Sequence, residues 1–219
     1  MPATIDLPDW RTLGAFPSAA LGAVGGIAWA ASFRGWMAEI AGRGSEFDWV
    51  GTFVLILLPG ALAGLLLGLA DYARRTAGRP GWRWLAAAPL LFTAPLFVPG
   101  GFEALVTTGI GGGAVAVPLF GILGGYALSR RGPLWLRIVS GVIALAYLVA
   151  GTLFALGSFT SGFELPVGAD WEPRRVWTGV TFLALMIVFA VACSLPHGRV
   201  VVRSQYRRSA DNGSTASAA

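Results

Sequence analysis

The stretch VGTFVLILLPGALAGLLLGLA, residues 50–70, decides what kind of fold this sequence can adopt. It contains no charged side chain, and about 20 such residues in a helix cross the ~30 Å hydrocarbon core of a bilayer. Only helices and closed barrels satisfy their backbone groups in that environment. Because a barrel strand would alternate apolar and polar residues, this continuous run predicts a membrane-spanning helix.

Apolar runs of this kind recur along the chain, which has 219 residues, 55% of them hydrophobic and 12% charged. A soluble domain carries roughly a quarter charged residues. The sequence therefore predicts an all-α integral membrane protein, a six-helix transmembrane bundle forming one domain over residues 1–208, with a disordered polar tail over residues 209–219. The expected spans are residues 13–32, 50–70, 84–99, 104–128, 134–156 and 176–195.

The positions of the arginines predict the orientation in the membrane. All 16 basic residues are arginine, and cytoplasmic segments beside membrane spans retain an excess of such residues. Arginines follow the second, fourth and sixth spans, whereas each of the other three connections carries one more acid than arginine. Both termini are therefore expected in the cytoplasm. Abundant Ala, Gly and Arg without lysine favours the cytoplasmic (inner) membrane of a bacterium. The arginines after the second and fourth spans are Arg74, Arg75, Arg79, Arg83, Arg130 and Arg131.

Several kinds of chemistry have no motif in this sequence. His197 and Cys193 are the only residues of their types, so a histidine or cysteine metal cluster is not expected. There is no Walker-type loop and no Gly-x-Ser-x-Gly motif. The arginines lie beside apolar spans, where they are explained as topology signals rather than as a nucleic-acid surface. We therefore expect no metal, no cofactor and no nucleic acid.

Small residues recur at every fourth position on three predicted spans, and such faces let membrane helices approach closely. Two interpretations remain open, namely tight packing within the chain and an interface between copies of it. The faces consist of Gly14, Ser18, Gly22, Gly26 and Ala30; of Gly60, Gly64 and Gly68; and of Gly109, Gly113, Gly121 and Gly125, with Val117 interrupting the last.

Prolines interrupt two predicted spans. Pro89, Pro95 and Pro99 lie in the third and Pro118 lies in the fourth, and each removes a backbone donor from its helix. Such helices either pack as kinked neighbours or unwind to build a binding site near the middle of the membrane. The hydroxyls available to a polar path are those of Thr93, Thr107, Thr108 and Thr152.

Five acidic residues on the outer side are the candidate catalytic groups: Glu46, Asp48, Glu103, Asp170 and Glu172. Two pairs of them directly precede the second and sixth spans. If these pairs converged, their carboxylates would suit a hard divalent cation or a shared acid and base role. If they stay apart, they are solvated loop acids that follow the charge asymmetry of the connections.

Between the first two spans, Phe33, Trp36, Met37 and Ile40 recur at helical spacing. This pattern predicts a short helix near residues 33–43 that lies in the outer interface of the membrane. Its role would be either an anchor or a lid over an outward-facing pocket.

Arginines also follow the last span, with apolar and aromatic residues between them. They serve either as a topology signal or as ligands of anionic lipid headgroups. They are Arg199, Arg203, Arg207 and Arg208.

Three functions follow from these observations. The sequence favours a non-catalytic membrane component, either an accessory subunit of a larger complex or a scaffold that packs against lipids. Its partners would then be the lipid bilayer and a membrane protein or further copies of the chain. The alternatives are translocation of an ion or small amphiphile through the third and fourth spans, and an enzyme of the outer face that uses the acidic residues on a lipid-linked substrate.

Overall fold

The structure, a computed structural model, describes residues 13–41, 45, 47–76, 80–103, 112–129, 131–156 and 172–198. Within these ranges the chain is helical and contains no strand. This confirms the all-α class. The elements are α1 (Ala15–Ala41), η3 (Trp49–Leu57), α2 (Leu58–Arg75), η4 (Trp82–Phe97), α4 (Gly112–Leu128), α5 (Leu134–Ala155), α6 (Pro173–Cys193) and η6 (Leu195–His197).

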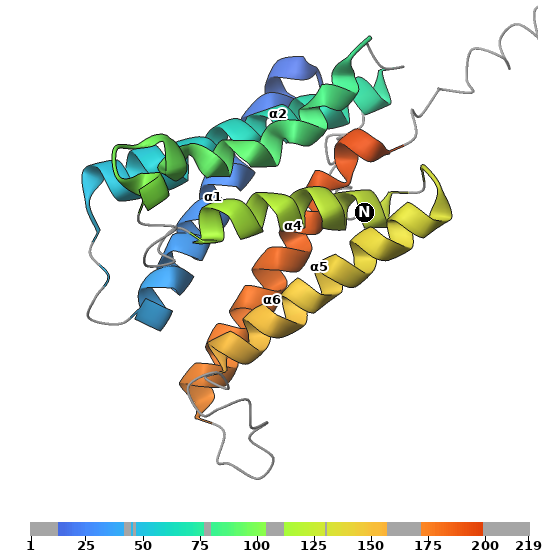
Figure 1. Cartoon of the computed structure of the whole chain (residues 1–219). Helices are drawn as coiled ribbons and strands as arrows, with labels where there is room; N and C mark the ends of the chain where they lie inside the picture. The colour runs from blue at the N-terminus through green and yellow to red at the C-terminus, as the bar shows by residue number, and fades with distance from the viewer. Residues whose placement is uncertain are drawn as a thin grey trace, which may run out of the picture.

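The helices form two groups that follow the order of the chain (Figure 1). In the N-terminal group, α2 lies between α1 and η4. In the C-terminal group, α4, α5 and α6 all contact one another. The two groups meet where α1 packs on α6 and where η4 packs on α4.

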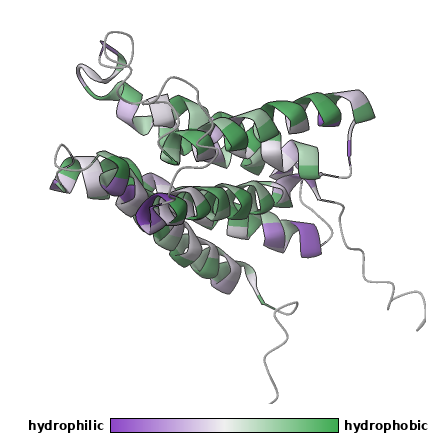
Figure 2. Ribbon diagram, turned by 90° about the horizontal axis from the view of Figure 1, so that it is seen from below, coloured by the Kyte–Doolittle hydropathy of each residue, from purple (hydrophilic) through white to green (hydrophobic). Residues whose placement is uncertain are grey.

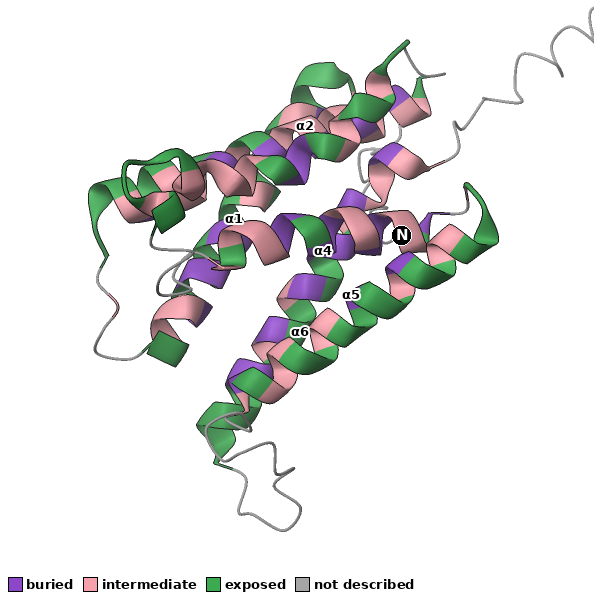
Figure 3. Ribbon diagram, in the orientation of Figure 1, coloured by how far each residue is buried: buried purple, intermediate pink, exposed green. Residues whose placement is uncertain are grey.

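Four helical segments of the described chain are long and apolar enough to cross a membrane, namely Ala15–Ala41, Trp49–Arg75, Leu134–Ala155 and Pro173–His197. Figure 2 shows long apolar stretches along the helices. On α5 the large side chains of Ile138, Val142 and Val149 point outward, whereas the small Ser140 and Ala144 are buried (Figure 3). Large apolar side chains outside and small ones inside suit a lipid environment, because lipid tails are as apolar as leucine.

Contacts at the two ends of the bundle show the directions in which the helices run. At one end of the bundle, the indole of Trp36 on α1 donates to the carbonyl oxygen of Thr178 on α6 at 2.9 Å, and the Thr178 hydroxyl donates to that of Ala155 on α5 at 3.2 Å. At the other end, the ring of Tyr126 on α4 meets that of His197 on η6. Therefore α1 and α5 run antiparallel to α6, whereas α4 runs parallel to it.

An aromatic cluster joins α1 to α6 in the core. The rings of Trp29 and Phe33 stack at 5.1 Å between centroids, and Phe33 contacts Trp36 at 5.4 Å. From α6, Phe189 stacks on Trp29 at 4.5 Å and Phe182 lies 4.9 Å from Trp36. Aromatic pairs at these distances contribute about 0.5–1.5 kcal/mol each beyond the area they bury.

The prediction of a separate interfacial helix near residues 33–43 is wrong. Over residues 33–41 the chain continues α1 without a break, and residues 42 and 43 lie outside the described ranges. Phe33 and Trp36 are buried at 7% and 6% exposure, because the ring of Trp36 packs on Phe182 of α6 and Phe33 packs between Trp29 and Trp36. The helical spacing of Phe33 and Trp36 marks the buried face of the longer helix α1.

The second predicted span begins with a wider helical geometry. Its first part, η3, is a π-helix, and α2 continues from it with Pro59 in its first turn. Asp48 caps the start of η3 by accepting a hydrogen bond from the Gly51 backbone N–H at 2.6 Å. Proline is tolerated here because the first turn of an α-helix leaves its N–H groups unpaired.

The proline-rich third segment is a 3₁₀ helix from Trp82 to Phe97. In η4, Pro89 and Pro95 lack the N–H that an α-helical bond would need. Its 16 residues extend about 32 Å at the ~2.0 Å rise of a 3₁₀ helix, against about 24 Å at the ~1.5 Å rise of an α-helix. In α4, by contrast, Pro118 lies inside a helix that stays α-helical from Gly112 to Leu128.

Candidate functional site

The contact between α1 and α2 is made largely by backbone. A Cβ added at Gly64 would lie 2.8 Å from the Cα of Gly26, and one added at Gly22 would lie 2.9 Å from the Cα of Gly68. Real Cβ atoms are not found this close to another backbone, so these positions accommodate only glycine. Glycines have no side chains to fill the volume next to this helix–helix contact, so an open space remains beside it.

That space is a groove of about 580 Å³ between α1, α2, η4 and α6. Its volume falls within the ~300–1,000 Å³ typical of small-molecule sites. Leu21, 62% exposed, lies on its rim, and a Cβ added at Gly25 in its wall would meet no atom within 4 Å. The groove is therefore open to the surroundings of the bundle rather than sealed.

Three aromatic rings close the deep end of the groove. Trp29 stacks on Phe189 and meets the edge of Phe92 at 5.4 Å, and Phe92 meets Phe189 edge-on at 5.7 Å. The only polar atom of the Trp29 side chain donates to the carbonyl oxygen of Leu185 at 2.8 Å. The deep end thus presents an apolar surface.

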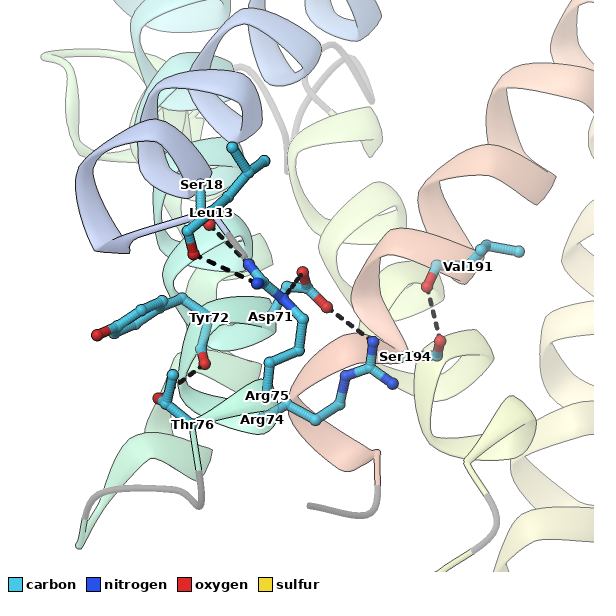
Figure 4. A network of polar contacts seen from close by, with 9 residues as sticks. All are labelled: Leu13, Ser18, Asp71, Tyr72, Arg74, Arg75, Thr76, Val191 and Ser194. Carbon is cyan, nitrogen blue, oxygen red and sulfur yellow. Dashed lines mark hydrogen bonds and ion pairs between the residues drawn. The ribbon is translucent and has the colours of Figure 1, made fainter. Parts of the chain in front are cut away.

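Polar groups gather at the other end, which we call the mouth of the groove (Figure 4). Arg75 on α2 donates to Asp71 Oδ2 at 2.9 Å, to the Ser18 hydroxyl at 2.7 Å and to the carbonyl oxygen of Leu13 at 3.3 Å. Its side chain is only 8% exposed. Arg75 therefore ties the end of α2 to the start of α1.

Arg74 also lines the mouth, but its bond is to Asp71 on its own helix. Its Nη2 donates to Asp71 Oδ1 at 2.7 Å, and its side chain is 25% exposed. Its Nε is buried and finds no acceptor among the described residues. Two guanidinium groups thus share one carboxylate, which leaves the mouth positively charged.

The structure does not place the described outer acids in this groove. Asp48 caps η3, Glu172 precedes α6 with a carboxylate oxygen 3.4 Å from Arg175 Nε, and Glu103 is exposed in the segment that follows η4. Glu46 and Asp170 lie outside the described residues, so the convergence of the two acidic pairs stays a prediction. Arg199, Arg203, Arg207 and Arg208 also lie outside the described residues, so their role as ligands of lipid headgroups stays a prediction. The described residues hold no group of three or more potential metal ligands.

Sequence reasoning did not identify the mouth as a site. It interpreted Arg74 and Arg75 as topology signals and did not pair them with Asp71. A usable signal existed, because an aspartate followed by arginines three and four positions later faces both of them on a helix. The other partners of Arg75, which are Ser18 on α1 and Leu13 just before it, carry no such local signal.

No known protein family, curated protein or solved structure matches this chain.

Proposed function

We propose that this protein is a non-catalytic, multi-pass component of a bacterial cytoplasmic membrane, and that its working surface is the groove beside the contact of α1 with α2. One observation carries the proposal. The polar side chains that line the groove make bonds between helices or with one another, and its remaining surface is glycine backbone and apolar side chains. Such a surface holds an apolar chain and offers no nucleophile beside a general base.

Six crossings are supported by the dimensions of the helices. Four segments are long enough by residue count. At about 32 Å, η4 reaches across the ~30 Å hydrocarbon core although it has only 16 residues. The 17 residues of α4 extend about 25 Å, and the undescribed residues 104–111 precede them.

The charge distribution supports cytoplasmic termini. Among the described residues, the end of the bundle that holds the mouth carries five arginines and one acid. The opposite end carries three arginines and four acids. Because arginines are retained in the cytoplasm, the mouth faces that side, and an even number of crossings brings both termini there.

The proposal is tested by site-specific photo-cross-linking in the native membrane. A photoreactive residue replaces Leu21 on the groove rim, and a control replaces Ile143, which is exposed on α5 away from the groove. We expect one discrete adduct at residue 21 and only a diffuse background at residue 143. Identical patterns at both positions would show that the groove is ordinary lipid-facing surface.

A second function, translocation of an amphiphile, is favoured by one observation. Phe92 belongs to η4, the proline-containing 3₁₀ helix, and it forms part of the groove wall. Against it, the hydroxyls of Thr93 and Thr152 donate to their own helices at 2.7 Å, so they do not line a path. Flux of labelled lipid across proteoliposomes that is lost in Pro95→Leu and kept in Pro118→Leu would establish translocation.

A further inference from the structure

The groove has the length of one membrane leaflet. Ser18 lies at its mouth and Trp29 at its deep end, and the eleven residue steps along α1 from Ser18 to Trp29 extend about 16 Å. This is half of the ~30 Å hydrocarbon core. A chain that entered from the headgroup layer beside the mouth would therefore reach the aromatic rings near the middle of the membrane.

The mouth has the charge that an acidic headgroup requires. Asp71 accepts bonds from both arginines, so one positive charge is left in excess, and the Arg74 side chain is 25% exposed at the mouth. Arginine binds phosphate through several donors at once. Arg75 is already engaged with α1, so Arg74 is the side chain placed to meet such a group.

From these two observations we infer that the groove binds one anionic phospholipid of the leaflet at the arginine end, with an acyl chain along Gly25 and its phosphate at Arg74. The inference rests on the proposed function, since it names what the groove holds. A lipid tail gains little by leaving other tails for an apolar groove. Selectivity must therefore come from the headgroup and from the shape of the groove.

The test measures lipid binding to the full chain, delipidated in a neutral detergent, by native mass spectrometry. Phosphatidylglycerol and phosphatidylcholine with the same acyl chains are titrated separately, and inorganic phosphate is added as a competitor. We expect one phosphatidylglycerol to bind at least fivefold more tightly than phosphatidylcholine. Millimolar phosphate should leave this binding unchanged, because it supplies the headgroup charge without the chain.

Two variants address the two halves of the site. Arg74→Gln should weaken phosphatidylglycerol binding about fivefold, as expected for one arginine beside an anionic headgroup. Arg83→Gln removes the same charge from an exposed position on η4 outside the groove and should have no effect.

Gly25→Leu should abolish binding of both lipids by filling the groove. Its matched control, Gly35→Leu, alters another glycine of α1 where an added Cβ is equally free of contacts.

The outcomes separate the two proposals. Equal binding of the two lipids, or displacement of phosphatidylglycerol by phosphate alone, would refute the anionic lipid while leaving the groove as a binding surface. Equal binding in Gly25→Leu and Gly35→Leu would refute the groove itself. Thermal unfolding of each variant shows whether it is folded. Because a Cβ at position 25 has no atom within 4 Å, Gly25→Leu tests the groove even if Arg74→Gln fails to fold.

Discussion

Trp29 on α1 donates its indole N–H to the main-chain carbonyl of Leu185 on α6, at 2.8 Å. This bond crosses the interface between the N-terminal and the C-terminal helices and forms the closed end of the groove. A buried indole N–H without a partner would be costly, and α6 supplies the acceptor from its own backbone. The stacking of Trp29 on Phe189, one turn further along α6, holds the ring in the same position.

Replacing Trp29 with Phe should destabilise the bundle modestly. The substitution keeps a ring beside Phe189 and removes the donor to Leu185. Interhelical hydrogen bonds in membrane proteins contribute about 0.6 kcal/mol on average, so we expect a loss of about 0.5–2 kcal/mol in the free energy of unfolding. Denaturant titration in mixed micelles measures it. Trp84→Phe, at a position 84% exposed, is the control and should unfold like the unchanged protein.

The glycine contact between α1 and α2 predicts a large difference between two alanine variants. Gly64→Ala places a Cβ against the backbone of α1 and should cost about 1–3 kcal/mol, the range for overpacking a filled interface. Gly25→Ala adds the same atom where nothing lies within 4 Å, and it should be neutral or slightly stabilising because alanine favours helix. The same unfolding titration applies. Equal stabilities of the two variants would show that α1 and α2 are not in backbone contact.

Arg75 and Arg74 should differ in their effect on stability although they are adjacent. Arg75→Met removes the bonds to Ser18 and to Leu13 and should destabilise the chain by about 1–3 kcal/mol, as expected for hydrogen bonds that involve a charged group. Arg74→Met leaves the tie between α1 and α2 in place and should cost less. Thermal unfolding in detergent compares them. If Arg74→Met proved the more harmful change, the assignment of Arg75 as the tie would fail.

Cysteine labelling should reveal the orientation. Native Cys193 is buried at 2% exposure, so it should remain unreactive in the folded chain. Asp48→Cys should react with a membrane-impermeant maleimide in intact cells, and Arg83→Cys should react only after the cells are opened, because arginine-rich segments stay inside. The reverse pattern would invert the topology and place the mouth of the groove on the outer side.

The small-residue faces show how far a sequence pattern reaches. Gly64 and Gly113 both belong to such faces, yet a Cβ at Gly64 would strike α1, whereas one at Gly113 would meet nothing within 4 Å. Small residues at every fourth position indicate that this face of a helix permits close approach of another helix. The spacing does not report whether a helix of the same chain occupies that face, because the partner depends on how distant segments are arranged.

The sequence by itself determined that this chain forms long apolar helices, since runs such as residues 50–70 have the length and lack of charge that a bilayer selects. Only the tertiary structure decided that α1 continues through Phe33 and Trp36 to Ala41, and that Arg75 joins Ser18 across 57 positions. Local spacing constrains neighbours three or four residues apart on one helix. Spacing can pair Asp71 with the arginines of its own helix, but the groove arises where four separate segments meet, and no local pattern brings those segments together.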